Sequence, residues 1–127
     1  HALEGIFPLL GEGHISIQNT GTDERNMVHI THKSGCDIHI PLSKDMFGAF
    51  GTTLLVGSIG NKTITDSDSY YSFKKQLVNF VHYLRTGQEP FPFSETIELM
   101  KLVIGGIISR EQGGRKVLLS EIKEIGE

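Results

Sequence analysis

Histidine is the residue type in this sequence with the widest chemical range, and the chain of 127 residues contains six of them. His14, His29 and His39 fall in segments where polar and apolar residues alternate, so they can share the polar face of one sheet. Converging imidazoles could bind zinc, which takes three or four ligands at about 2 Å. The alternative is ordinary solvated histidines, because no cysteine or acidic residue has the spacing of a metal motif. We therefore assign no metal ligand.

Two glycine-rich stretches have the composition of nucleotide-binding loops but not their context. Residues 11–16, GEGHIS, follow a helical pattern and precede a strand-like one, the reverse of the order in a dinucleotide-binding fingerprint. In residues 57–63, GSIGNKT, Asn61 separates the glycine from Lys62, so the spacing that wraps backbone N–H groups around phosphates is missing. We interpret the first stretch as a turn that ends a helix and the second as a tight turn between strands.

The other candidates for chemistry are isolated residues. Cys36 is the one cysteine, so no disulfide can form within the chain, and we interpret it as an incidental small residue near a turn. No serine lies in a nucleophile-elbow motif. Glu95 and Glu98 are explained by the positive end of a helix that begins at Ser94. The residues alone therefore describe a domain without a complete active site.

Charge and hydropathy limit the classes of partner. The 12 Lys and Arg against 15 Asp and Glu give a formal charge of -3, and the basic residues are scattered. Nucleic acids and anionic membranes usually need a concentrated basic face, so we expect neither as a partner. No apolar run approaches the roughly 20 residues that a membrane-spanning helix needs. The lone cysteine suits a reducing compartment, which favours a cytoplasmic location.

The hydrophobic pattern of the first half has the period of strands. Apolar and polar residues alternate at 14–18, 27–31 and 37–40, which predicts an antiparallel meander with one buried and one polar face. Residues 52–59 predict a further strand, with a short partner near Ile64. In residues 14–18, the alternation predicts that the apolar side chains lie on one face of the sheet and the polar side chains on the other.

The second half has the period of helices. An apolar stripe from Phe73 to Leu84 predicts a helix that Gly87 ends, and a second helix runs from Ser94 to about Ile108. Gly105-Gly106 lies inside the second helix, where each glycine costs about 1 kcal/mol relative to alanine, so we expect close packing there.

The order of these elements defines a fold class. Residues 116–119 predict a final strand after Gly113-Gly114, so grouped strands precede grouped helices. This order indicates an α+β fold in which an open, mainly antiparallel sheet has helices packed on one face. The length of the chain suits a single domain, residues 1–127.

The C-terminal part resembles a known family. A helix ending in LRTGQEP, residues 84–90, leads to an acid-capped helix. The pattern S-x-x-x-G-[GKR]-x-V-x-L comes next, matched by Ser109, Gly113, Gly114, Val117 and Leu119, with one more residue between Gly114 and Val117 than the pattern has. This run resembles the C-terminal domain of the glucose–fructose oxidoreductase, inositol dehydrogenase and MocA family (Gfo/Idh/MocA). The segment FGTTLLVGSIGNKTI also resembles the family's G-T-x-G hairpin strand.

The opening stretch, HALEGIFPLLG, is similar to the same family's linking helix, D-x-G-x-H-x-x-D-x-x-x-x-L-x-G. On that motif His1 takes the position of the catalytic histidine, and Glu4 stands where aspartate is usual. The resemblance makes His1 the one candidate catalytic residue, because a histidine can accept a hydroxyl proton while hydride leaves the same carbon. The alternatives are that His1 is the remnant of a tag and that Glu4 is a structural acid on the helix surface.

The resemblance implies a parent NAD(P)-dependent dehydrogenase that acts on a sugar, polyol or derivative. Its NAD or NADP would sit in an N-terminal Rossmann domain, whose fingerprint and E-K-P lysine are missing from this sequence. Residues 1–127 would then be the substrate-binding and oligomerisation domain, inactive alone, with no cofactor bound to this fragment, and a homo-oligomer through its sheet face. The alternative is a free-standing module that self-associates or holds a partner through the polar face formed by His14, Ser16, Gln18, His29, Thr31 and His39.

Overall fold

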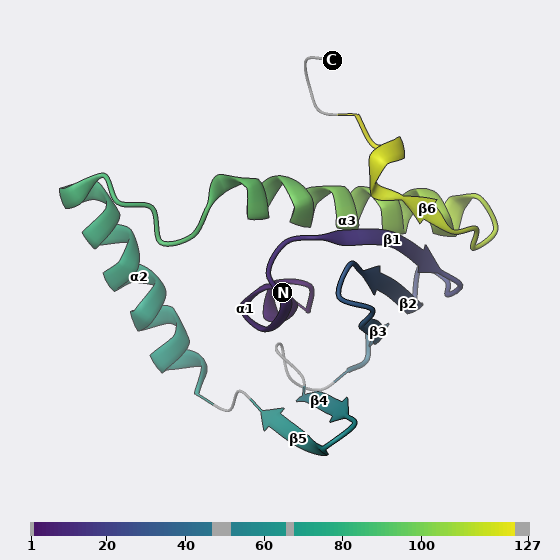
Figure 1. Ribbon diagram of the computed structural model, residues 1–127, viewed down its shortest axis with the longest axis horizontal. Helices are drawn as coiled ribbons and strands as arrows, with labels where there is room; N and C mark the ends of the chain where they lie inside the picture. The colour runs from purple at the N-terminus through teal and green to yellow at the C-terminus, as the bar shows by residue number, and fades with distance from the viewer. Residues whose placement is uncertain (1, 47–51, 66–67, 124–127) are drawn as a thin grey trace. The chain divides into compact units, whose positions relative to one another are not determined.

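The structure is a computed structural model that describes residues 2–46, 52–65 and 68–123. It confirms the predicted α+β class, with an open antiparallel sheet and helices (Figure 1). The contacts within the chain divide it into two compact units, His1–Met46 with Ser94–Glu127, and Phe47–Phe93. Among the described residues, no helix has both the length and the apolar character needed to cross a membrane.

The first unit contains a four-stranded sheet in which every neighbouring pair is antiparallel. Its spatial order is β3-β2-β1-β6, and all four strands coincide with segments that the sequence pattern predicted. A short 3₁₀ turn and helix, η1 and α1, lead into the sheet, and α3 and η2 complete the unit. The bounds are η1 Glu4–Ile6, α1 Phe7–Leu10, β1 His14–Asn19, β2 Arg25–His32, β3 Asp37–Ser43, α3 Phe93–Glu111, β6 Val117–Leu118 and η2 Leu119–Glu121.

The core of this unit lies between α3 and one face of the sheet. Figure 1 shows α3 running along the sheet beside β1 and β6. Ile17, Ile30 and Leu102 are almost fully buried in this layer. A Cβ added at Gly105 would lie 2.7 Å from Ile17 Cγ2, and one at Gly106 would lie 3.3 Å from Ile17 Cδ1. The close packing expected at this glycine pair is confirmed, since a side chain there would meet the central strand.

The predicted orientation of the side chains at the start of β1 was wrong. The pairing register with β2 shifts between His14 and Ser16, which is a β-bulge. Ile15 is consequently 49% exposed, while His14 is only 5% exposed and lies on the same side of the sheet as Ile17. Strict alternation cannot anticipate one extra residue, because the bulge moves every preceding side chain to the opposite face. His14 therefore does not belong to the polar outer face.

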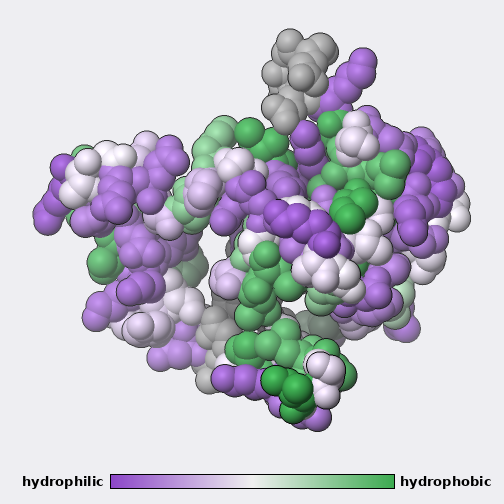
Figure 2. Space-filling model, in the orientation of Figure 1, coloured by the Kyte–Doolittle hydropathy of each residue, from purple (hydrophilic) through white to green (hydrophobic). Residues whose placement is uncertain are grey.

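The second unit contains a β-hairpin and a helix. Strands β4 (Thr52–Gly57) and β5 (Gly60–Thr65) pair with Gly57 opposite Gly60, which confirms the tight turn between strands. Helix α2 (Ser69–Thr86) begins where the Asp68 carboxylate accepts a hydrogen bond from the Tyr71 amide. None of the α2 residues is buried. Figure 2 shows hydrophobic residues at the surface over β4 and β5.

Candidate functional site

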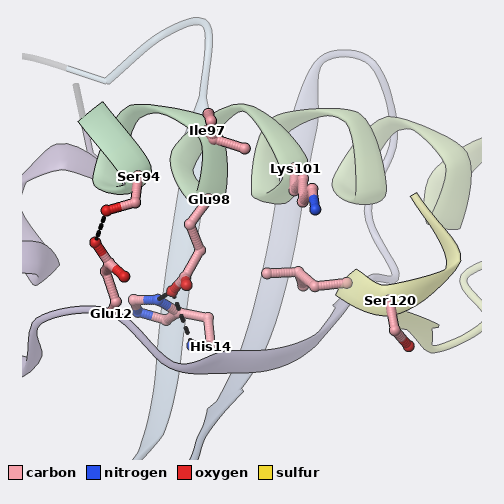
Figure 3. Close-up of a pocket in the computed structure, with 8 residues that line it drawn as sticks. Glu12, His14, Ser94, Ile97, Glu98, Lys101 and Ser120 are labelled. Atoms are coloured by element: carbon pink, nitrogen blue, oxygen red, sulfur yellow. Dashed lines mark hydrogen bonds and ion pairs between the residues drawn. The ribbon is translucent and has the colours of Figure 1, made fainter. Parts of the chain in front are cut away.

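A cavity of about 290 Å³, lined by both polar and apolar side chains, lies in the first unit beside the N-terminal half of α3 (Figure 3). Four α3 residues at positions i, i+3, i+4 and i+7 lie on one face of the helix and contribute to its wall. The approach to β1 and the turn η2 supply the rest. The lining residues are Glu12, His14, Ser94, Ile97, Glu98, Lys101, Leu119 and Ser120.

The carboxylate of Glu98 is the most heavily hydrogen-bonded group of this cavity. Its Oε1 accepts bonds from the backbone amides of Gly13 (2.8 Å) and His14 (2.9 Å) and from His14 Nδ1 (2.5 Å). Two consecutive amides can reach one oxygen because Gly13 has φ 122°, a conformation that residues with a Cβ rarely adopt. A Cβ at Gly13 would also lie 2.3 Å from Cδ of the flexible Lys33 side chain, which would have to move, so the φ angle is the stronger reason for glycine at this position.

These contacts keep Glu98 ionised. Burial acts to raise the pKa of Glu98, but the backbone hydrogen bonds from His14 and Gly13 act to lower it, and so do the hydrogen bond and charge of the His14 side chain. The result is a pKa below the ordinary value for glutamate. Because the Glu98 side chain is only 19% exposed, this is a mostly desolvated negative charge with fixed donors.

The His14 imidazole lies beneath Glu98, and its side chain has no exposed surface. Its ring contacts the rings of Phe7 and His32, with centroid distances of 5.0 and 4.9 Å. Since Nδ1 bonds the carboxylate, Nε2 is left facing the interior, and it has no hydrogen-bond partner among the described residues. A buried polar atom that has no hydrogen-bond partner costs free energy on folding.

The His32 ring bonds to the backbone through both of its nitrogens. Its Nδ1 accepts a hydrogen bond from the Ser34 amide at 3.2 Å, so this nitrogen must present a lone pair. The proton on Nε2 is then available to the Glu12 carbonyl at 3.2 Å. The backbone before β1 is therefore fixed on both sides, by His32 at Glu12 and by Glu98 at Gly13 and His14.

The remaining polar groups of the cavity are nearer to solvent. Ser94 Oγ donates a hydrogen bond to the Glu12 carboxylate, and both Ser94 and Ser120 are exposed. Lys101 is half-buried on the same helix face. The cavity therefore presents carboxylate, hydroxyl and ammonium groups, which are the groups that bind a small polar molecule.

The pairing of Glu98 with His14 resembles the way a carboxylate orients a catalytic imidazole. Here, however, Nε2 is enclosed, and a general base must come within hydrogen-bond reach of the proton that it abstracts. The pair therefore positions the backbone and supplies a fixed charge in the described conformation. Glu12, Ser94 and Lys101 line the part of the cavity that is exposed or half-buried.

The predicted site residues have different outcomes. His1, the candidate catalytic residue, lies outside the described residues. Glu4 is exposed in η1. The histidines of the zinc hypothesis do not converge, because the bulge turns His14 toward α3 while His29 and His39 occupy the other face. Over residues 2–46, 52–65 and 68–123, no group of three or more His, Cys, Asp or Glu side chains could hold a metal ion.

The role of Glu98 was not predicted from the sequence. The residue was expected to interact with the helix dipole, but only Glu95 lies in the first turn of α3. Ser94, expected as the N-cap, is the second residue of the helix, and its hydroxyl bonds Glu12 instead. A signal was available, because Ser94, Glu98 and Lys101 are polar residues on one helical face whereas the neighbouring face is apolar.

Comparison of the chain with protein-family models, curated proteins and solved structures finds no match. A functional proposal therefore depends on the motif residues of the sequence and on what those residues do in the structure.

Proposed function

We propose that residues 1–127 are the C-terminal, substrate-binding and oligomerisation domain of an NAD(P)-dependent oxidoreductase of the Gfo/Idh/MocA type. The substrate would be a sugar, a polyol or a derivative. The observation that carries the proposal is that the motif from Ser109 to Leu119 coincides with a complete structural connection, from the last turns of α3 to β6 and η2.

Each residue of this motif has a structural reason to be of its type. Ser109 has no exposed surface, and its Oγ accepts a bond from the Asn19 amide (2.8 Å) and donates to the Arg115 carbonyl (2.5 Å). Gly113 and Gly114 have φ of 74° and 80°, which favours glycine. The last two motif residues, Val117 and Leu119, are buried. The family pattern thus selects residues that this fold needs, which supports likeness of fold more directly than likeness of reaction.

Two further features support a role in substrate binding. The open antiparallel sheet with a helix on one face is the architecture that the resemblance implies for such a domain. The cavity at Glu98 contains groups that can donate hydrogen bonds to hydroxyls and accept them, as a polyol requires. In this proposal, His1 would accept the hydroxyl proton of the substrate, and NAD or NADP bound by a Rossmann domain would supply the hydride-transfer chemistry.

The first test uses the chain as it is. Calorimetric titration of residues 1–127 with NAD and with NADP should show no binding, and micromolar affinity for either would overturn the assignment as a domain separate from the nucleotide site.

The second test uses the whole gene. Its upstream reading frame should encode a nucleotide-binding fingerprint. The encoded protein should reduce NAD or NADP with a member of a sugar and polyol panel, and His1→Ala should abolish that rate. A reading frame that begins near His1 would contradict the proposal.

The second candidate function is a free-standing module that self-associates or binds a partner through its sheet. It is favoured by the outer face of the sheet, where Gln18, His29, Thr31 and His39 remain at least partly exposed. Both candidates predict assembly through this face, so sedimentation that shows a monomer at high concentration would contradict that part of each. The reading frame distinguishes them.

A further inference from the structure

Two carboxylates of the cavity beside α3 each have one oxygen that the described residues leave without a donor. All three hydrogen bonds to Glu98 end on Oε1, and the bond from Ser94 to Glu12 also ends on Oε1. Within the described ranges, Oε2 of either carboxylate accepts no hydrogen bond. Each oxygen of a carboxylate can accept about two bonds, so acceptor capacity is unused on both side chains.

These unused oxygens keep contact with solvent. In residues 2–46, 52–65 and 68–123, His14 Nε2 is the one enclosed side-chain nitrogen or oxygen of a buried or half-buried residue that has no hydrogen-bond partner. Glu12 and Glu98 are half-buried, and their Oε2 atoms also have no donor there, so neither atom is enclosed. Both oxygens are therefore accessible, and both residues line the cavity.

A fully buried polar side chain on the wall of the same cavity adds to the excess of acceptors. His14 lines the cavity, and its side chain has no exposed surface. Its Nδ1 donates to the Glu98 carboxylate, so Nε2 of the neutral ring is an acceptor, and this atom has no partner among the described residues. The wall therefore lacks hydrogen-bond donors rather than acceptors.

The lining also carries an excess of negative charge. Its charged groups are the carboxylates of Glu12 and Glu98 against the single ammonium of Lys101, which is not unpaired. Neither carboxylate forms an ion pair with Lys or Arg in the described part of the chain. Figure 3 shows the two carboxylates near the start of α3 and Lys101 further along the helix. Because the Glu98 charge is mostly desolvated, a cationic group of a ligand would offset a cost that these residues leave uncompensated.

We propose that Glu12 and Glu98 bind the ammonium group of an amino-substituted sugar or polyol, which is the substrate of the parent enzyme. An ammonium has three donors and no acceptor, and it therefore complements this wall. A guanidinium binds best to both oxygens of one carboxylate, but Oε1 of each carboxylate is already hydrogen-bonded here. The inference rests on the proposed function, whose substrate class it narrows.

The size of the cavity and the rest of its lining suit such a molecule. The volume of about 290 Å³ is at the small end of the range for ligand pockets, about 300–1,000 Å³. Ile97 and Leu119 supply apolar surface for the C–H groups of a sugar, and the Ser120 hydroxyl can bond its hydroxyls. A metal ion fits less well, because no group of three His, Cys, Asp or Glu side chains within the described ranges could hold one.

The experiment compares two sugars that differ in one group. The ¹⁵N-labelled full chain is titrated with D-glucosamine and with D-glucose at about pH 6, where an amine is protonated. NMR spectra follow the backbone amides of Gly13 and His14, which bond Glu98 Oε1 and should respond to a ligand at Oε2. We expect glucosamine to bind about tenfold more tightly than glucose, because an ion pair with a mostly buried carboxylate is stronger than its hydrogen bond to a hydroxyl.

A matched pair of variants locates the ammonium. Glu12→Gln removes one carboxylate and leaves the amide bonds of Glu98 in place, and it should reduce the ratio of the two affinities by about fivefold. Glu111→Gln is the control, because Glu111 is an exposed glutamate at the other end of α3 and does not line the cavity. It should keep the ratio of the wild type.

The outcomes separate this inference from the proposed function. Equal affinity for the two sugars overturns the inference and leaves a substrate-binding role for the cavity in place. A preference for glucosamine that Glu12→Gln does not reduce also overturns it, because the ammonium then lies elsewhere. If neither sugar binds, the inference fails and the cavity loses its part in the proposed function. The upstream reading frame tests the oxidoreductase assignment independently of all three outcomes.

Discussion

His14 and Glu98 are 84 positions apart in the sequence, yet His14 Nδ1 and Glu98 Oε1 are 2.5 Å apart in the structure. The same carboxylate oxygen accepts two backbone amides at the entry to β1. This contact joins the second turn of α3 to the first residue of β1, and both residues line the cavity. It therefore links the local fold at the entry to β1 with the candidate site.

Glu98 should make stability depend on acid pH. Because its pKa in the folded chain is below that of an unfolded glutamate, about 4.3, its contribution is fully present above that pH. The contribution is lost as pH falls through the lower, folded-state pKa. Urea unfolding at several pH values between about 3 and 7 should show this decline, and Glu98→Gln should reduce its steepness. Glu89→Gln, at an exposed loop position, should leave the profile as it is.

A double-mutant cycle should detect the coupling between His14 and Glu98. His14→Phe keeps a ring against Phe7 and His32 but removes the Nδ1 donor, and Glu98→Gln removes the charge. We expect a coupling of about 1–3 kcal/mol in the free energy of unfolding, typical of hydrogen bonds to a charged, mostly buried group. Additive effects within about 0.5 kcal/mol would show that the two side chains do not depend on each other.

Ser109→Ala should destabilise the fold more than its small change in volume suggests. The Ser109 hydroxyl joins the Asn19 amide of β1 to the Arg115 carbonyl, and it has no exposed surface. Removing it leaves a buried donor and an acceptor unpaired, which costs about 1–3 kcal/mol. Chemical denaturation measures this loss, and Ser120→Ala, at an exposed position, serves as the control. Equal stability of the two variants would contradict the structural role given to the motif serine.

Features that depend on a local sequence pattern, such as the burial of strand residues and the end of a helix, could be predicted from the sequence. Val28 and Ile30 are buried as the alternation predicted, and Gly87 ends α2 with φ 71° as a helix stop. The bulge at His14–Ser16 could not be predicted, because its extra residue leaves no mark in the hydrophobic pattern. The contact of Glu98 with Gly13 and His14 could not be predicted from the sequence either, because it depends on where α3 crosses the sheet.

Gly105→Ala tests how closely α3 approaches the sheet. Alanine raises helix propensity by about 1 kcal/mol, but its Cβ would lie 2.7 Å from Ile17 Cγ2 and 3.1 Å from Ile122 Cδ1. Ile17 is a buried residue of the central strand and cannot move aside, so overpacking of about 1–3 kcal/mol should exceed the gain.

Gly106→Ala is the matched control, with the same gain in propensity and a nearest contact of 3.3 Å to Ile17 Cδ1, the mobile end of that side chain. We expect urea unfolding to show a loss of about 1 kcal/mol for Gly105→Ala and a smaller loss, or a gain, for Gly106→Ala. If Gly105→Ala were the more stable variant, α3 could not lie against Ile17 as closely as described, and the positions of Glu98 and Ser109 along the sheet would need to change with it.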